Sequence, residues 1–173
     1  MMNVKRKLLI VGAGQYAHIA KETAVAMNCF SRIDFVDDNS PLAISKVEDL
    51  EKLSSEYTYG FVAIGNPDVR LKFMDKLKQN GYNVATLIHP QSYVSPSASV
   101  GDGCIIEPCA VVQANAKLGV GCLISAGAVI NHNAVIEDGC HIDCNATVAA
   151  RSIVRMKTKV DIGQVYKGED GCV

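Results

Sequence analysis

An aliphatic residue recurs at every sixth position through the second half of the chain. All thirteen positions are Ile, Leu or Val: Ile88, Val94, Val100, Ile106, Val112, Leu118, Ile124, Ile130, Ile136, Ile142, Val148, Val154 and Val160. A small residue stands four positions after most of them, as at Ala98, Cys104 and Ala110. The period fits neither a helix of 3.6 residues per turn nor a simple strand alternation. It is typical of hexapeptide repeats that form a parallel β-helix.

The physical logic of the repeat predicts how residues 88–166 fold. Each hexapeptide supplies one short strand and one corner, and three of them close a triangular coil of roughly 18 residues. The aliphatic side chain points into the prism, and the small residue fits the tight corner. Coils stack at the strand spacing of about 4.8 Å. The series supplies about four coils, and several are needed because one coil cannot bury its own apolar column.

Residues 1–87 follow a different pattern, in which strands alternate with helices. Strands are expected at 7–11, 33–36, 61–64 and 84–87, and helices at 15–27, 47–53 and 66–80. Asn66 and Pro67 suit a helix start, and Gly81 suits a helix stop. This alternation predicts an α/β unit with a parallel sheet covered by helices.

A glycine-rich turn follows the first expected strand. Gly12, Gly14 and Ala17 form a GxGxxA pattern between strand and helix, and Asp37 lies about twenty residues further on. Taken alone, the pattern indicates a dinucleotide such as NAD or FAD. Four strands make only half of a full dinucleotide fold, so a mononucleotide part such as UDP fits better. A plain strand-to-helix connection is the alternative.

Composition narrows the class of function further. The net charge is −1, Trp is absent and aromatic residues make up 6% of the chain, so we expect neither nucleic acid nor membrane insertion. The basic start before Leu8 could open a signal peptide, but the apolar run breaks at Gly12. Seven cysteines without a CxxC pair suggest neither a disulfide framework nor a zinc knuckle. A reduced, cytoplasmic chain is expected.

Several motifs together resemble a known family. They are LIVGAG at 9–14, FVDD at 35–38, FVAIGNPDVR at 61–70, LIHP at 87–90 and INHNAVIEDGCHI at 130–142. The chain resembles bacterial sugar acetyltransferases that join a Rossmann-like domain to a left-handed β-helix. These include sialic acid O-acetyltransferases and N-acetyltransferases of nucleotide-linked 4-amino sugars. The resemblance implies a nucleotide-sugar domain at 1–87, a left-handed acyltransferase β-helix at 88–166 and a tail at 167–173.

The same resemblance implies acetyl-CoA as co-substrate, no metal, and a homotrimer with active sites at its interfaces. His132 aligns with the catalytic histidine. An imidazole, whose ordinary pKa is about 6.5, can take the proton that an attacking amine or hydroxyl loses. Asn133 departs from the family, which often has Glu or Asp here; it can orient the imidazole but supplies no charge. His141 aligns with a histidine that contacts acetyl-CoA. Ala150 aligns with a backbone N–H donor to the thioester carbonyl.

The resemblance also assigns substrate-binding residues in the first half. They are Gly12, Gly14, Gln15, Tyr16, Asp37, Asp38 and Gly65. Relatives often read GGHG where this chain has residues 14–17, so the sugar is not specified by this motif. We expect His18 and His89 to be structural. Relatives also carry further coils beyond Val160, which help to hold CoA.

Three function hypotheses follow. The first is acetyl transfer from acetyl-CoA to an amino or hydroxyl group of a sugar, with His132 as general base. The second is a β-helix metalloenzyme resembling γ-carbonic anhydrases, which needs three histidines where the helix offers His132, His141 and His89 at its edge. The third is a non-catalytic nucleotide-sugar binder. The column Cys104, Cys122 and Cys140 could form a metal or redox ladder, but small buried side chains are the simpler interpretation.

Overall fold

Contacts divide the chain into two compact units that meet between Leu87 and Ile88 in the sequence. The structure is a computed structural model that describes residues 6–168. Of the expected tail at 167–173, residues 169–173 lie outside the described range. No helix of the described residues is long and apolar enough to cross a membrane.

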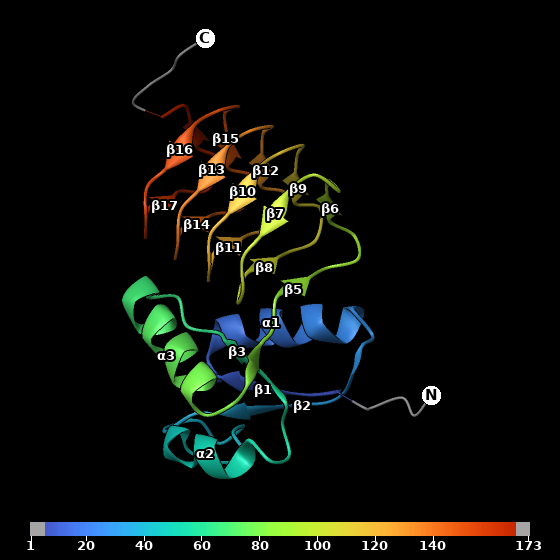
Figure 1. The fold of residues 1–173 in the computed structure, drawn as a ribbon, viewed down its shortest axis with the longest axis vertical. Coiled ribbons are helices and arrows are strands. Elements are labelled where there is room, and N and C mark those ends of the chain that lie inside the picture. Colours follow the sequence, from blue (N-terminus) through green and yellow to red (C-terminus); the bar gives the residue numbers. More distant parts are fainter. Residues whose placement is uncertain (1–5, 169–173) are drawn as a thin grey trace. The chain divides into compact units, whose positions relative to one another are not determined.

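The first unit contains one parallel sheet in the order β2-β1-β3-β4 (Figure 1). Its strands are β1 (Arg6–Val11), β2 (Phe30–Val36), β3 (Tyr59–Val62) and β4 (Asn83–Val84). Its helices are α1 (Gln15–Ala26), the 3₁₀ turn η1 (Val47–Asp49), α2 (Leu50–Leu53) and α3 (Pro67–Gln79). The predicted alternation of strands and helices is therefore present.

The central strand β1 is buried on both faces of the sheet. Leu8, Leu9, Ile10 and Val11 have no exposed surface, which is the continuous apolar pattern of a parallel strand covered on both faces. The predicted boundaries of α3 are also explained locally. The Asn66 side chain accepts a hydrogen bond from the third residue of α3 at 3.1 Å, satisfying a donor that the first helical turn leaves free.

Three predicted strands differ from the observed ones. The strand expected at 61–64 runs from Tyr59 to Val62, because its pairing with β1 ends at Val11 and the chain then turns. The strand expected at 84–87 is β4, which ends at Val84, while Leu87–Ile88 pairs within the second unit. The strand expected at 33–36 begins earlier, at Phe30, where β1 continues to offer a partner.

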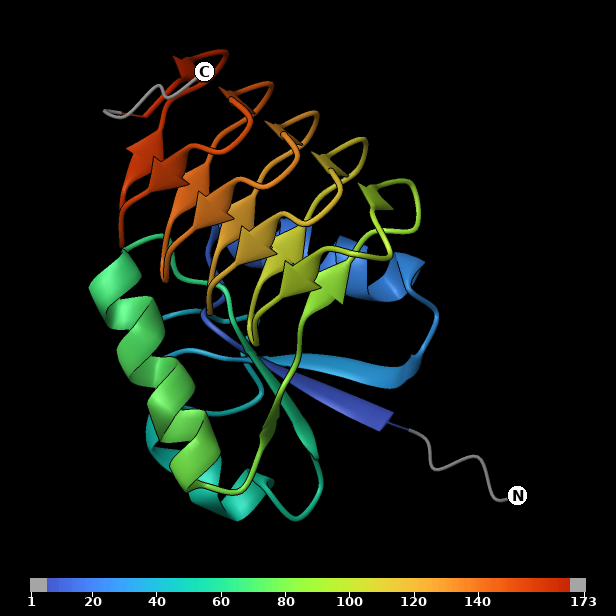
Figure 2. The ribbon, with the colours of Figure 1, turned by 45° about the horizontal axis from the view of Figure 1, so that its top comes forward.

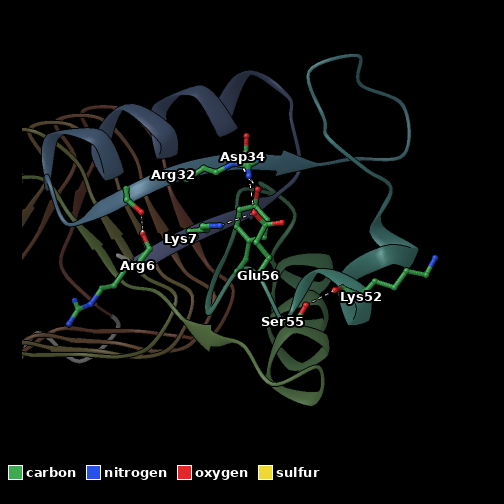
Figure 3. A network of polar contacts seen from close by, with 9 residues as sticks. Arg6, Lys7, Arg32, Asp34, Lys52, Ser55 and Glu56 are labelled. Carbon is green, nitrogen blue, oxygen red and sulfur yellow. Dashed lines mark hydrogen bonds and ion pairs between the residues drawn. The ribbon is translucent and has the colours of Figure 1, made fainter. Parts of the chain in front are cut away.

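A polar network crosses the first unit near the start of β1 (Figure 3). Glu56 accepts from Lys7 and from Arg32, both at 2.8 Å. Asp34 accepts from Arg32 and from the buried Tyr57 hydroxyl, both at 2.6 Å. Burial and the hydrogen bond to Asp34 raise the pKa of Tyr57. The network ties the chain before β3 to the strands β1 and β2.

Over its described residues, the second unit is a β-helix of fourteen two-residue strands in three parallel sheets (Figure 2). Sheet I contains β7 (Ser99–Val100), β10 (Lys117–Leu118), β13 (Val135–Ile136) and β16 (Ile153–Val154). Sheet II contains β5 (Leu87–Ile88), β8 (Ile105–Ile106), β11 (Leu123–Ile124), β14 (His141–Ile142) and β17 (Lys159–Val160). Sheet III contains β6 (Tyr93–Val94), β9 (Val111–Val112), β12 (Val129–Ile130), β15 (Thr147–Val148) and β18 (Val165–Tyr166).

The aliphatic series forms the core of this unit, as the period predicts. Its members from Ile106 to Val160 are buried in one cluster, together with the small residues from Cys104 to Ala146. Ile88, Val94 and Val100 are partly buried against the same cluster. Residues eighteen positions apart pair between coils, so each coil hydrogen-bonds to the next. The period of six therefore predicted the repeated parallel strands of this unit.

From Gly103 to Gly163, each corner turns at the third residue after the aliphatic position, where φ is positive; at Gln91 and Ser97 in the first two corners it is not. The residues with positive φ are Gly103, Cys109, Asn115, Gly121, Gly127, Asn133, Gly139, Asn145, Arg151, Lys157 and Gly163. Gly and Asn adopt this left-handed conformation at low cost, whereas other residues are strained there. The preference explains why Gly and Asn recur at this position.

The cysteine column lies inside the prism. Cys104, Cys122 and Cys140 are fully buried, and their thiols donate to carbonyls of the neighbouring coil at 3.0, 3.2 and 3.0 Å. Burial raises the pKa of Cys140 to about 12. This is the geometry of small core residues whose thiols satisfy backbone acceptors.

Candidate active site

His132 lies on the corner that joins sheet III to sheet I. We call this the His132 corner; it comprises residues 95–98, 113–116, 131–134, 149–152 and 167–168. His132 is the second residue after β12, and its side chain is exposed. The hexapeptide repeat explains this position, because His132 lies midway between the inward Ile130 and the inward Ala134 and therefore faces outward.

Asn133 contacts the imidazole directly. Its Nδ2 lies 2.9 Å from Nδ1 of His132. A base that acts through Nε2 carries its proton on Nδ1. That N–H can donate a hydrogen bond to the amide oxygen of Asn133. Rotating the amide by half a turn exchanges its oxygen and nitrogen at the same position, so this contact suits either tautomer of the ring. The left-handed backbone of Asn133, with φ of 59°, gives a structural reason for Asn here.

Ala150 occupies the place equivalent to His132 one coil further on. Ile130 pairs with Val148, and the carbonyl of His132 accepts from the backbone N–H of Arg151 at 3.2 Å. Within the described residues, the N–H of Ala150 has no acceptor. The structure therefore brings His132, Asn133 and an available backbone donor together on one corner.

His141 lies elsewhere on the coil, on β14 of sheet II. The His132 corner joins the other two sheets, so in a triangular coil it lies opposite sheet II. A single chain thus holds the two imidazoles on opposite sides of the prism. Nε2 of His141 lies 3.1 Å from Oγ of the buried Ser125 and 3.8 Å from Oδ1 of Asp143.

The acid beside His141 is Asp143, which is itself held by hydrogen bonds. Burial alone would raise the pKa of Asp143, but hydrogen bonds from the Cys144 N–H and from Lys159, with the nearby His141, lower it overall. The Lys159 ammonium lies 3.1 Å from Asp143. The sequence analysis missed Ser125 and Asp143. They are eighteen residues apart and so stack in neighbouring coils, and Asp143 follows the outward-facing His141 by two residues. This spacing is the signal that places both beside the imidazole.

In the first unit, the predicted substrate-binding residues gather at the carboxyl ends of β1, β2 and β3. This edge is where open parallel sheets bind ligands. Gly12 follows β1 with φ of 99°, and a Cβ there would lie 3.1 Å from the carbonyl oxygen of Ala63. Gly14 is the N-cap of α1, and a Cβ built on it would meet no atom within 4 Å. Gln15 is exposed and Tyr16 half-buried in the first turn.

The two aspartates stabilise loops at this edge. Asp37 accepts from the backbone N–H groups of Ala13, Asn39 and Ser40 at 2.9, 2.9 and 3.0 Å. These hydrogen bonds, from Asn39 and Ala13 first, lower the pKa of Asp37. Asp38 accepts from the N–H of Val47 at 3.0 Å. A ribose contact for Asp37 stays a prediction; its observed partners are backbone donors.

Gly65 is positioned by a residue that sequence reasoning left without a role. Arg70 in α3 is fully buried, and its Nη1 donates to the carbonyls of Ile64 and Gly65 at 2.8 and 2.7 Å. The loop after β3 therefore depends on a guanidinium beneath it. Arg70 lies in the FVAIGNPDVR motif, but only the tertiary structure reveals its burial.

The remaining histidines have local contacts. His18 is exposed on α1 with its ring 5.9 Å from that of Phe35, and Nδ1 of His89 accepts from the N–H of Gln91 at 3.1 Å. Across residues 6–168, no three His, Cys, Asp or Glu side chains gather as metal ligands would.

Comparison with known proteins supports one family. Residues 7–77 match the family described as the PglD N-terminal domain. The acetyltransferase domain of PglB from Neisseria gonorrhoeae is 28% identical, with a TM-score of 0.83 over 96% of this chain and 95% of that one. The same domain with acetyl coenzyme A is 29% identical, with a TM-score of 0.79 over 93% and 87%.

More distant structures share the fold. Perosamine N-acetyltransferase from Caulobacter crescentus, an H141N mutant with CoA and GDP-perosamine, is 20% identical, with a TM-score of 0.63 over 92% and 90% of the two chains. WeeI from Acinetobacter baumannii is 16% identical, with a TM-score of 0.71 over 93% and 88%. The first unit therefore matches the PglD N-terminal domain family over residues 7–77, and the chain as a whole is similar to the acetyltransferase domain of PglB.

Proposed function

We propose that this protein transfers an acetyl group from acetyl-CoA to an amino or hydroxyl group of a nucleotide-linked sugar, with His132 as general base. The observation that carries the proposal is the exposed His132 beside an available N–H of Ala150, in a chain whose relative PglB is described as an acetyltransferase. A PglB structure with acetyl coenzyme A supports the choice of donor.

The reaction needs no covalent enzyme intermediate. The acceptor nitrogen or oxygen attacks the thioester carbonyl carbon while His132 removes its proton. The backbone N–H of Ala150 donates to the carbonyl oxygen as negative charge develops there. When the carbon–sulfur bond breaks, the thiolate leaves with the electron pair, and the proton held by His132 can be returned to it. Asn133 keeps the ring oriented through Nδ1.

For the first unit, we propose a Rossmann-like nucleotide-sugar domain at 1–87. The carboxyl edge of its sheet offers the backbone N–H groups of Gly14 and Gln15 at the start of α1, a combination that attracts phosphate. The N–H groups of Gly12 and Ala13 already donate to Val36 and Asp37. Gln15, Tyr16, Asp38 and Gly65 would complete the site, with Asp37 acting by holding the loops that form it.

We also propose that the β-helix is left-handed and assembles as a homotrimer. Because one chain separates His132 from His141, a site that uses both takes them from neighbouring chains. Sheet III presents an outward column suited to contact with a second copy, since most of its members are apolar: Tyr93, Val111, Val129, Thr147 and Val165. The free cysteines of residues 6–168 support a reducing compartment, so we place the reaction in the cytoplasm.

The deciding experiment measures thiol release from acetyl-CoA with a panel of UDP-, dTDP- and GDP-linked amino sugars. We expect one acceptor to be consumed, and the His132→Gln protein to lose about 100- to 10,000-fold in kcat with an unchanged melting temperature, because the side chain is exposed. A His18→Ala protein is the control. Calorimetry that finds nucleotide-sugar binding but no CoA binding would favour a non-catalytic binder and reject the enzyme.

A further inference from the structure

The three corners of the β-helix differ in charge. Among the described residues, the corner from sheet I to sheet II carries Asp102, Glu137 and Asp138, and the corner from sheet II to sheet III carries Glu107, Asp143 and Asp161. Over the described residues, which end at Gly168, the His132 corner carries no carboxylate. Its charged residues are the cations Arg151 and Lys167, both exposed. The corner is therefore electropositive relative to the other two.

The missing carboxylates leave backbone donors available. In four turns of the other corners, carboxylates accept from the N–H of the second corner residue at 2.8–3.0 Å, whereas the N–H groups of Asp138 and Ile162 have no acceptor within residues 6–168. The four donors to carboxylates are Val120, Ala126, Cys144 and Met156. The corresponding N–H groups of Ala114, His132 and Ala150 have no acceptor within residues 6–168. They form a column, one donor per coil, beside the exposed imidazole.

Arg151 stands next to this column. The backbone N–H of Arg151 donates to the carbonyl of His132. Arg151 lies one coil above Asn133, at the same position in the corner. It adopts the left-handed conformation, with φ of 63°, where Asn or Gly is usual in this chain. Its guanidinium has no hydrogen bond or ion pair with any described residue. By contrast, Arg155 and Lys159 pair with acids.

We propose that Arg151 binds an oxyanion of the acceptor, namely the phosphoryl group attached to the sugar ring. The inference rests on the proposed function and assigns a binding residue to the same site. Guanidinium and phosphate pair through two parallel hydrogen bonds, and Lys167 adds charge two coils above Asn131. In the coils of His132 and Arg151, no carboxylate of this corner competes with a phosphate for these cations and N–H groups, or repels it.

The acceptor's phosphate is a better ligand for Arg151 than a phosphate of acetyl-CoA, because it lies closer to the reacting atoms. In a nucleotide-linked amino sugar, one ring separates the reacting nitrogen from the phosphoryl group. In acetyl-CoA, the whole pantetheine arm separates the thioester from the nearest phosphate. A cation only one coil, or about 4.8 Å, above the residue beside His132 therefore matches the acceptor's phosphate.

The test compares Arg151→Asn with Lys157→Asn. Both replace a cation by Asn at the same corner position with φ near 60°, so both should fold at least as stably as the parent. Lys157 lies on the corner from sheet I to sheet II, away from His132. We expect Arg151→Asn to raise KM for the nucleotide sugar about tenfold, the scale of one charged hydrogen bond, with kcat and KM for acetyl-CoA unchanged. Lys157→Asn should match the wild type.

Two further arms separate the causes. With an amino sugar that lacks the nucleoside diphosphate, wild type and Arg151→Asn should have equal kcat/KM. With acetyl-pantetheine in place of acetyl-CoA, the difference between the proteins should persist. A shift in KM for acetyl-CoA alone, or an equal effect in Lys157→Asn, would overturn the assignment of Arg151. A wild-type protein that transfers no acetyl group to any acceptor would overturn the proposed function as well.

Discussion

The amide of Asn133 lies 2.9 Å from Nδ1 of His132, and the two residues are neighbours on one exposed corner. A neutral amide can hold the ring in place, but it stabilises a protonated imidazole less than a carboxylate would. The pair therefore predicts a base that is oriented without charge assistance.

Asn133→Asp should raise kcat several-fold. A carboxylate accepts from Nδ1–H in either orientation, selects the tautomer with Nε2 free, and favours the protonated ring. Asp also tolerates the left-handed backbone. Steady-state rates across the pH range check this, with Asn145→Asp as the control, because Asn145 has φ of 56° at the same position on another corner. An unchanged or lower rate at every pH would remove Asn133 from the mechanism.

Mixed trimers should regain activity that neither parent has. His132→Ala and His141→Ala each remove one side of every site if neighbouring chains supply the two imidazoles. Co-refolded mixtures then contain some interfaces with both residues intact. We expect activity above that of either variant alone, approaching a quarter of the wild type if subunits mix at random. Mixtures as inactive as their parents would show that the two histidines do not cooperate between chains.

Stability should depend on Asp37 in a pH-dependent way. Backbone donors lower its pKa in the folded protein below the unfolded value of about 3.9. Its charged form thus contributes stability that is fully present above that value and is lost as pH falls through the folded pKa. Asp37→Asn should lower the free energy of unfolding by about 1–2 kcal/mol at pH 7. Urea denaturation at pH 7 and at pH 3 measures both, and the difference between the proteins should shrink at pH 3.

Core packing of the β-helix should be costly to disturb. Ile142 is fully buried among coils on both sides, so Ile142→Ala should lower the free energy of unfolding by about 2–5 kcal/mol. Ile153, with 42% of its surface exposed, is the matched control, and Ile153→Ala should cost much less. Equal melting temperatures for the two variants would be incompatible with an inward Ile142.

Local rules predicted the boundaries that depend on neighbouring residues. The Asn66 cap, Pro67 and Gly81 place α3 because they act through their own backbone. The strand at 84–87 was wrong because its ends choose partners far away in sequence: Val84 pairs with β3, whereas Leu87–Ile88 pairs with β8. A short apolar segment does not contain the information that decides which distant strand each of its residues pairs with.

The sequence by itself determined the coil, since a period of six applied without interruption admits one set of inward side chains and stacks residues eighteen apart. That spacing alone places Ala150 above His132. Only the tertiary structure decided which polar groups are already occupied. It showed that Asp37 accepts from backbone donors and that Arg70 is buried beneath Gly65. It also showed that the N–H groups of Ala114, His132 and Ala150 have no acceptor within residues 6–168. These outcomes depend on long-range hydrogen bonds, whose partners no local pattern identifies.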